Sequence, residues 1–277
     1  RVPTPIDVKN CSVRAIAAFA RLEEHAMRKS PDYMPRIGQG IIRYNRQGIV
    51  NVLTALADSI RVGDDYGRFR FQFENGAAWF GMHGSFVVVN NKLEQAVGFD
   101  HGPAGNITED AYFALIARHI GVRFAFIHAF MDEQSPYSLK DFVAQRRRWF
   151  GGLWLCVLSP YIAGRDRLIL GSFMAMWTVA PLCIGLVYWN VLVPTGTPVW
   201  LALIGGRSFS YYVALYILGF ICNFDRRMGW RRYLGLLILQ IVLIPIFSVM
   251  EASGVIYGLL KPPKDFYIVQ KERRSTV

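Results

Sequence analysis

The chain has 277 residues, 53% of them hydrophobic, and a formal net charge of +11 from 31 Lys and Arg against 20 Asp and Glu. This is too apolar for a purely soluble domain. The arginines flank apolar runs, which fits an anionic membrane face better than nucleic acid, so no nucleic-acid partner is expected. The four cysteines are isolated and form no C-x-x-C pair, so the sequence indicates neither a zinc site nor a disulfide framework.

The first part of the chain, 1–135, mixes helical and strand patterns, which predicts an α/β domain. Apolar residues at helical spacing predict helices over 10–29, 49–62 and 108–120. Runs of β-branched or alternating residues predict strands over 37–44, 68–74, 85–90 and 122–131. Within the second of these runs Phe69, Phe71 and Phe73 alternate with charged or amide residues, so a half-buried strand is expected there.

The next segment, 136–160, is expected to form an amphipathic helix at a membrane surface. Ser138 and Asp141 make an S-x-x-D start signal, and apolar residues recur behind it at helical spacing. The arginine run 146–148, taken alone, favours a simpler interpretation. A run of like charges is usually a solvated or positive-inside face, here a basic flank that precedes a membrane span.

Three side chains of this expected helix favour a functional role instead. Gln145, Arg148 and Trp149 fall within an arc of about 100° on a side that is not wholly apolar. An amide, a guanidinium and an indole would therefore project together from a helix that lies against the membrane.

A membrane region is expected over 168–260, because three apolar runs follow, over 168–193, 199–222 and 233–260. The first has about 26 residues without a formal charge, enough to cross a hydrocarbon core of about 30 Å. Arginines after the second run and the basic tail 261–277 both favour the cytosol by the positive-inside rule.

The third apolar run leaves two interpretations open. A full crossing would place the basic tail on the opposite side, whereas a kinked or re-entrant segment around Pro245 would not. The run also contains Glu251, and a carboxylate at membrane depth is costly and therefore a functional candidate. Alternatively, Glu251 pairs with an arginine near the interface.

A second chemical motif, Thr108-Glu109-Asp110, begins the expected helix 108–120, with Thr108 at its N-cap. The positive end of the helix dipole should keep Asp110 ionised. An ionised carboxylate in a fixed position can accept a proton from an attacking sugar hydroxyl. Taken alone the trio is ordinary helix-start chemistry, but Gln145 follows after one expected strand, so the two helices could form one cleft.

These motifs resemble those of membrane-integrated family 2 glycosyltransferases, in which an E-D pair precedes Q-x-x-R-W. The phrases GQGIIRY, LADSIRVGDDYG, HGSFVVVN, SPYSLKDFVAQRRRW and DFYIVQKE are similar to those of the egghead-type β-1,4-mannosyltransferases. The similarity runs from about Asn10 to the end of the chain. It implies a partial GT-A-type domain, an interfacial helix and about three membrane-embedded segments.

The resemblance also implies an activity, an inverting transfer of mannose from GDP-mannose to a lipid-linked acceptor such as glucosylceramide, with a β-1,4 linkage. The expected setting is an ER or Golgi endomembrane with a cytosolic active site. In the implied mechanism Asp110 is the base, Arg148 contacts the departing diphosphate and Trp149 stacks on the acceptor sugar. Gln145 either hydrogen-bonds the substrate or holds a loop, and Glu109 either orients its neighbours or has a purely structural role. His83, a candidate substrate-binding residue, and His101 flank the cleft, although a lone histidine is commonly structural.

Members of this family hold Mg²⁺ or Mn²⁺ on the sugar nucleotide through a D-x-D-type motif. Residues 1–10 cannot supply it, so that motif is expected upstream of Arg1. The pair Asp64 and Asp65 is instead interpreted as turn chemistry between a helix and a strand. The sequence is therefore expected to be the C-terminal part of an enzyme and to bind nucleotide sugar poorly by itself.

Two alternatives stay open at the level of sequence. A processive polysaccharide synthase of the same family would need more spans to form a channel as wide as a sugar. The other alternative is a non-enzymatic membrane scaffold or transporter fragment. A transporter should show repeated spans in both halves, whereas the first half here is aromatic-rich and soluble in pattern. Oligomeric state is not indicated.

Overall fold

The computed structural model describes residues 8–11, 13–45, 51–99, 107–193, 196–224 and 226–263. His101, the terminal DFYIVQKE motif and most of the tail 261–277 lie outside these residues. The described residues divide into two compact units. Unit 1 lies within Arg1–Arg43, Asp65–Gln134 and Gly152–Ser172, and unit 2 lies within Tyr44–Asp64, Ser135–Gly151 and Phe173–Val277.

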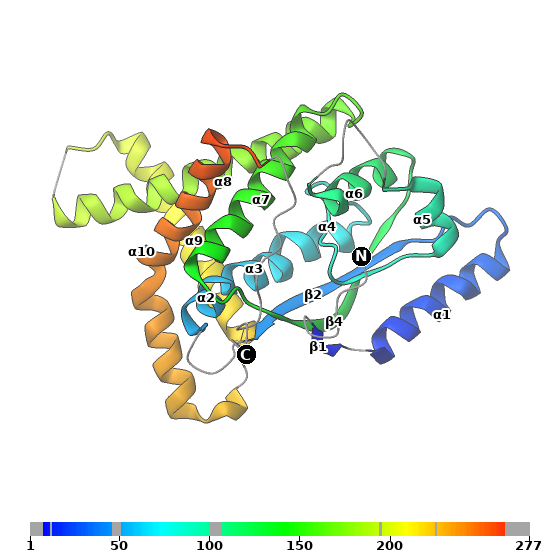
Figure 1. Ribbon diagram of the computed structural model, residues 1–277, viewed down its shortest axis with the longest axis horizontal. Coiled ribbons are helices and arrows are strands. Elements are labelled where there is room, and N and C mark those ends of the chain that lie inside the picture. Colours follow the sequence, from blue (N-terminus) through cyan, green and yellow to red (C-terminus); the bar gives the residue numbers. More distant parts are fainter. Residues whose placement is uncertain are drawn as a thin grey trace, which may run out of the picture. The chain divides into compact units, whose positions relative to one another are not determined.

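Unit 1 is built around a four-stranded sheet with strand order β1-β4-β2-β3. Figure 1 labels three of these strands, β1, β2 and β4. The strands are β1 (Val8–Cys11), β2 (Ile37–Asn45), β3 (Val87–Val88) and β4 (Phe124–Gln134). The pairs β1–β4 and β2–β3 are antiparallel. The predicted strand 37–44 is confirmed and ends one residue later, at Asn45. The predicted strand 122–131 is also confirmed, although β4 begins two residues later and ends three residues later. Of the predicted strand 85–90, only Val87 and Val88 form a strand.

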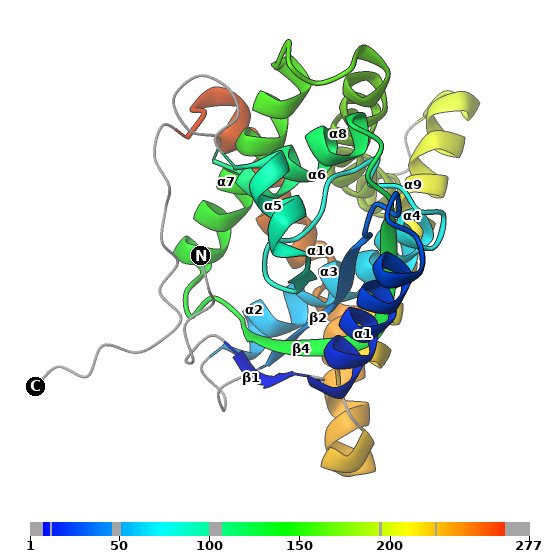
Figure 2. The same cartoon turned by 90° about the vertical axis from the view of Figure 1, so that its right-hand side faces the viewer.

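The helices of unit 1 are α1 (Val13–Lys29), the π-helical turn η1 (Asp65–Phe69), α4 (Arg70–Glu74), α5 (Asn91–Val97) and α6 (Glu109–His119). Helix α1 packs against β4 (Figure 2). It begins three residues later than the predicted helix, because Asn10 belongs to β1 and pairs with Asp132 of β4. A buried cluster that includes Phe73, Phe113 and Phe124 joins the helices to the sheet.

The predicted strand 68–74 is wrong, since this segment is helical through η1 and α4. In a strand all three alternating phenylalanines would face the core. In the structure Phe69 and Phe73 are 5% and 1% exposed, whereas Phe71 is 60% exposed. Two buried aromatics four residues apart match a helical period. An ion pair from Arg70 Nε to Glu74 Oε1, 2.8 Å long, spans the same helical interval on the surface.

Unit 2 is helical. It holds α2 (Val52–Ala57), α3 (Ser59–Asp64), α9 (Val199–Asn223), the short turn η2 (Arg226–Met228) and α10 (Trp230–Leu260), together with parts of α7 (Leu139–Leu158) and α8 (Gly164–Leu192). The predicted helix 49–62 is two short helices with Asp58 between them. At the start of α7, Ser138 Oγ accepts a hydrogen bond of 3.1 Å from the Asp141 amide and donates one of 2.6 Å to its carboxylate, which confirms the start signal.

Helices α3 and α9 cross with their backbones in direct contact. A Cβ atom at Gly219 would overlap the carbonyl oxygen of Ser59, and one at Gly63 would overlap that of Leu215. Only glycine permits this approach, because any larger residue would have to displace backbone atoms. Helix α3 is therefore held closely along the C-terminal half of α9.

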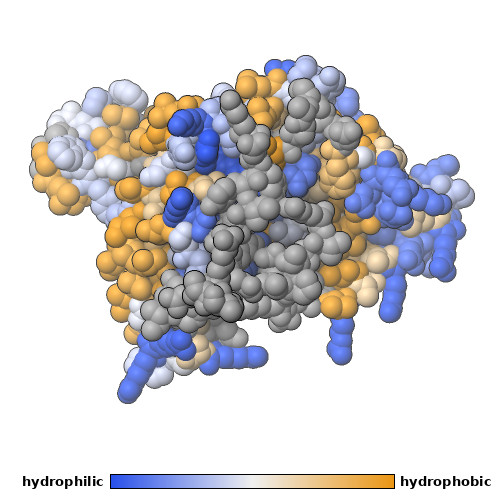
Figure 3. Space-filling view, viewed as in Figure 1, coloured by the Kyte–Doolittle hydropathy of each residue, from blue (hydrophilic) through white to orange (hydrophobic). Residues whose placement is uncertain are grey.

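Three helices, α8, α9 and α10, are long and apolar enough to cross a membrane. Hydrophobic side chains gather on the surface over α10 (Figure 3), and Ile238, Val242 and Val249 of this helix are all more than half exposed. Such a surface is poorly suited to water and suits a lipid environment. Pro245 lies inside α10, which is one continuous helix over the third apolar run.

Candidate functional site

In unit 1, the Asp110 carboxylate is fixed by backbone amides at the start of α6. Its Oδ1 accepts a hydrogen bond of 2.8 Å from Ala111 N, and its Oδ2 accepts one of 2.8 Å from Gly84 N. Thr108 is the N-cap residue of α6, as predicted, but its side chain makes no capping hydrogen bond and is buried against Gly152. Asp110 itself therefore satisfies a donor at the helix end, and it ties α6 to the loop 81–84.

His83 lies in that loop, directly before Gly84, so the structure brings His83 and Asp110 together. The His83 amide donates to Gln39 Oε1 at 3.1 Å, and its ring Nε2 lies 2.8 Å from Asp65 Oδ1. The ring also packs on Phe69, with 4.2 Å between ring centroids. These three contacts fix the loop that holds Asp110. Glu109 is exposed in the same turn of α6.

The interpretation of Asp65 as turn chemistry is wrong. Asp65 is buried in η1, and its Oδ2 accepts a hydrogen bond of 3.0 Å from the Ile42 amide of β2. With His83 on its other oxygen, this carboxylate is an internal anchor between a strand and the loop 81–84. The sequence contained a signal for this burial, because Asp65 is an acidic residue beside an aromatic-rich segment. Its partners could not be predicted from the sequence, because Ile42 and His83 lie on other elements.

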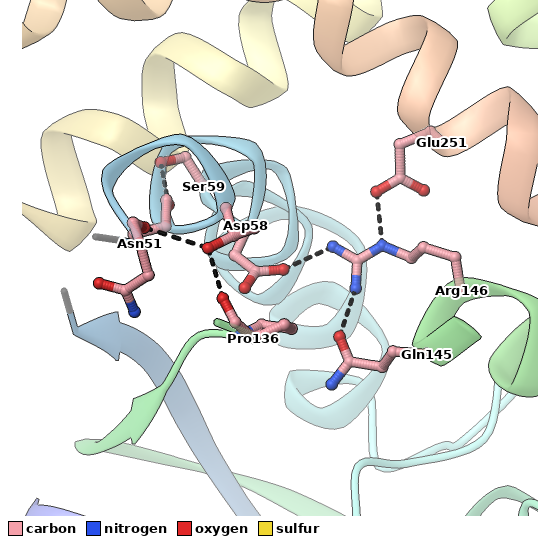
Figure 4. Close-up of polar contacts among 9 residues, drawn as sticks. Asn51, Asp58, Ser59, Pro136, Gln145, Arg146 and Glu251 are labelled. Atoms are coloured by element: carbon pink, nitrogen blue, oxygen red, sulfur yellow. Dashed lines mark hydrogen bonds and ion pairs between the residues drawn. The ribbon is translucent and has the colours of Figure 1, made fainter. Parts of the chain in front are cut away.

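In unit 2, Arg146 of α7 is fully buried at the centre of a polar cluster (Figure 4). Its Nη2 donates to Asp58 Oδ1 at 2.6 Å, its Nε to Glu251 Oε1 at 2.6 Å, and its Nη1 to Gln145 Oε1 at 2.9 Å. The cluster thus joins the α2–α3 junction, α7 and α10. We call Asp58, Arg146 and Glu251 the buried ion triad.

The electrostatics of the triad follow from its burial. Burial lowers the pKa of Arg146, but the charges of Glu251 and Asp58 raise that pKa above its ordinary value, so the guanidinium stays charged. Burial raises the pKa of the Asp58 carboxyl, and Arg146 opposes this rise. Loss of one partner of a buried ion pair typically costs about 3–5 kcal/mol, because an uncompensated charge is left behind.

The triad decides two open questions from the sequence. The alternative that Glu251 pairs with an arginine is confirmed. The interpretation of 146–148 as a solvated basic flank is wrong for Arg146, which is 0% exposed. Sequence reasoning missed Asp58 and Arg146 as structural partners. The signal was present, since Asp58 and Glu251 are acids inside apolar segments and so require a buried cation.

Trp149 lies beside the triad on α7. The Arg61 Cζ is 4.3 Å and the Arg146 Cζ 4.6 Å from the centroid of its ring. Gln145 is buried and accepts a hydrogen bond from Arg146, and Arg148 is half-buried. The structure therefore places Gln145 beside Arg146 and Trp149 beside both Arg146 and Arg61, contacts that the sequence did not indicate.

The predicted site residues fall into both units. Asp110, Glu109 and His83 lie in unit 1, and Gln145, Arg148 and Trp149 lie in unit 2. A single cleft that holds both sets stays a prediction. Among the described residues, no group of three or more His, Cys, Asp and Glu is placed to hold a metal ion.

Comparison with known proteins identifies related sequences. Residues 16–224 match the family described as "Glycosyl transferase family group 2". The chain is 37% identical over 239 residues to beta-1,4-mannosyltransferase egh of Drosophila melanogaster, and 35% identical over 240 residues to beta-1,4-mannosyltransferase bre-3 of Caenorhabditis elegans. The alignments cover 86% of this chain but 52% and 53% of those proteins, so the chain spans about half the length of the curated relatives it matches.

Proposed function

Since the chain belongs to glycosyl transferase family group 2, we propose that the protein transfers mannose from GDP-mannose to a lipid-linked acceptor such as glucosylceramide, forming a β-1,4 linkage. The names of the relatives, beta-1,4-mannosyltransferases at 35–37% identity, support the sugar and the linkage. Three helices long and apolar enough for a membrane support an acceptor that is itself lipid-anchored.

The observation that carries the proposal is the fixed carboxylate of Asp110. Single displacement needs a base that takes the proton of the acceptor hydroxyl as it attacks the anomeric carbon. The two backbone amides that hold Asp110 use one lone-pair site on each oxygen, so each oxygen keeps a further site for that proton. His83, held by Asp65, keeps the loop of Gly84 in place. Glu109, in the same turn, orients neighbouring groups.

The leaving diphosphate is assigned to α7. Arg148 contacts it, because a guanidinium can form paired hydrogen bonds to phosphate oxygens. Gln145 uses its carbonyl oxygen on Arg146, which leaves its amide N–H groups for the substrate. Trp149 offers an indole face to the C–H face of the acceptor sugar. Mg²⁺ or Mn²⁺ would be held by acidic residues of the relatives' other half, and the residues described here supply no ligand set for it.

In the proposed organisation, residues 1–135 form the C-terminal part of the catalytic domain, and residues 136–160 form an interfacial helix that binds the acceptor at the bilayer surface. Residues 168–260 hold the protein in the membrane, and residues 261–277 form a cytosolic tail. The proposed location is an ER or Golgi membrane with the active site facing the cytosol. The membrane part then has a function, because it keeps the headgroup of the lipid acceptor at the height of α7.

The test uses the full-length protein in lipid nanodiscs with GDP-mannose and glucosylceramide. Asp110→Asn should lower kcat by about 10²- to 10⁴-fold, since it removes a general base, and should leave donor binding largely intact. Glu109→Gln is the matched control and should lose much less. Near-normal turnover of Asp110→Asn would remove Asp110 as the base. Mass spectrometry of the product distinguishes one added hexose, the expected result, from the polymer of a processive synthase.

A further inference from the structure

We propose that Arg61 of α3 binds a phosphate group beside Trp149, and that Arg146, which contacts the same indole, does not. The identity of the phosphate as part of the sugar nucleotide rests on the proposed function.

Arg146 is buried and is not accessible to a ligand. Each of its three nitrogens donates to a protein oxygen, on Glu251, Gln145 or Asp58, and the side chain is 0% exposed (Figure 4). It is a structural cation, although it lies within the motif that carries the resemblance to glycosyltransferases.

Arg147 is directed to a helix end. Its Nε donates to the carbonyl oxygen of Lys261 at 2.8 Å, and its guanidinium carbon lies 4.2 Å from the ring centroid of Tyr257. Orphan carbonyls at a helix C-terminus are a favourable place for a cation. Arg147 therefore stabilises the end of α10.

Arg61 is different, because among the residues that the structure describes it has no carboxylate partner and no hydrogen-bond acceptor for its side chain. Its buried Nε atom is without a partner there. Asp58 precedes it by three residues, a spacing that normally pairs charges on a helix, yet Asp58 is bound to Arg146. A buried N–H without an acceptor costs free energy, which a bound anion would offset.

Arg61 is also held in a fixed place. Its guanidinium carbon lies 4.3 Å from the ring centroid of Trp149. Helix α3 is fixed against α9 by the close contacts of Gly63 with Leu215 and of Gly219 with Ser59. A half-buried, stacked guanidinium with unused donors is preorganised for an oxyanion, and its planar fork fits phosphate better than a point charge does.

Two sources can supply this phosphate. One is the diphosphate of the sugar nucleotide, and the other is the headgroup of an anionic membrane lipid. Both present tetrahedral phosphate oxygens to Arg61, so the chemistry of recognition is shared and an experiment has to separate them.

The experiment compares Arg61→Gln and Arg61→Lys with wild type in the full-length protein, in nanodiscs of phosphatidylcholine with and without phosphatidylserine. Arg70→Gln is the control, since Arg70 lies on the surface of α4, where it pairs with Glu74 and its guanidinium carbon lies 5.8 Å from the ring centroid of Phe126. Measured quantities are the KM for GDP-mannose, the inhibition constant of GDP and the KM for glucosylceramide.

If the phosphate belongs to the nucleotide, Arg61→Gln should raise the KM for GDP-mannose and the inhibition constant of GDP by about 10- to 100-fold, as expected for charge-assisted hydrogen bonds. If it belongs to a lipid, these constants stay unchanged and the stimulation by phosphatidylserine is lost. Either result supports the proposal. Arg61→Lys keeps the positive charge and replaces Arg61→Gln in the experiment if that variant does not fold. It should change the same constants in the same direction, but by about 3- to 10-fold.

Constants and lipid response within twofold of wild type for both variants would overturn the proposal. A wild-type protein without mannosyl transfer would overturn the proposed function instead. In that case calorimetric binding of GDP and of phosphatidylserine vesicles still tests Arg61, because a phosphate site must lose affinity in the variants whatever the reaction is.

Discussion

Arg146 and Glu251 are 105 residues apart in the chain, and their side chains meet at 2.6 Å inside unit 2. Around this contact, α7 and the last third of α10 run in the same direction. Gly254 packs on Arg146, Gly258 on Phe150, and Arg147 reaches the end of α10 at Lys261. The buried guanidinium of Arg146 therefore holds α7, which carries the proposed substrate-binding residues, against α10.

We expect Arg146→Met to destabilise the protein severely, because it leaves Asp58 and Glu251 buried without their cation. The expected loss is about 3–5 kcal/mol, the usual cost of breaking a buried ion pair. It is measured as the shift of thermal unfolding of the detergent-solubilised protein, followed by tryptophan fluorescence. The control Arg70→Met breaks an exposed pair with Glu74 and should change stability by less than about 1 kcal/mol. Equal unfolding temperatures for the two variants would show that the triad is not needed for stability.

Gly219→Ala should disrupt the crossing of α3 and α9, since the new methyl group would overlap the backbone oxygen of Ser59. Backbone atoms cannot rotate away, so we expect a loss of about 1–3 kcal/mol or more. Gly206→Ala on the same helix is the matched control, because nothing lies within 4 Å of its Cβ position. There alanine should be neutral or stabilise by up to about 1 kcal/mol. Thermal unfolding of both variants measures the difference, and a Gly219→Ala protein as stable as Gly206→Ala would contradict the close crossing.

Local signals in the sequence predicted much of the fold. The helix start predicted at Ser138 is confirmed, because it depends only on residues close to it in the sequence. The aromatic alternation at Phe69, Phe71 and Phe73 was misleading, because the same spacing that suits a strand also places Phe69 and Phe73 on one side of a helix. Neither the composition of this segment nor the spacing of its aromatic residues distinguishes a strand from a helix. The helix is favoured by packing of Phe69 and Phe73 against residues of β4 and α6.

The site was harder to predict, because its partners are distant in the chain. Asp110 was identified from its helix start, but its link to Gly84 depends on how a loop folds back. Asp58 and Arg146 are 88 residues apart, and no local pattern says which acid meets which arginine. Arg61 was missed for the same reason, since its distinction is the absence of a protein partner among the described residues.

Trp149→Ala should raise the KM for glucosylceramide by about 10-fold or more, because it removes the aromatic face on which the acceptor sugar is proposed to stack. Trp149→Phe keeps a ring for the sugar and for Arg61 and should therefore be milder. Steady-state kinetics with varied acceptor at saturating GDP-mannose measure both variants. An acceptor KM that Trp149→Ala leaves unchanged would reject the stacking role and leave the indole as a support for Arg61 and Arg146.

The C-terminal end of α10 should lie on the same side of the membrane as the start of α7. The reason is that Arg147 of α7 donates a hydrogen bond to the Lys261 carbonyl, and a charged side chain cannot make this contact across a bilayer. Single cysteines at Lys140, Gly196 and Lys261, all exposed positions, report the sidedness through labelling with a membrane-impermeant maleimide. Lys140 and Lys261 should react from the cytosolic side, and Gly196, which follows α8, from the opposite side. Labelling of Lys261 from the same side as Gly196, and not from the side of Lys140, would contradict the contact between Arg147 and Lys261.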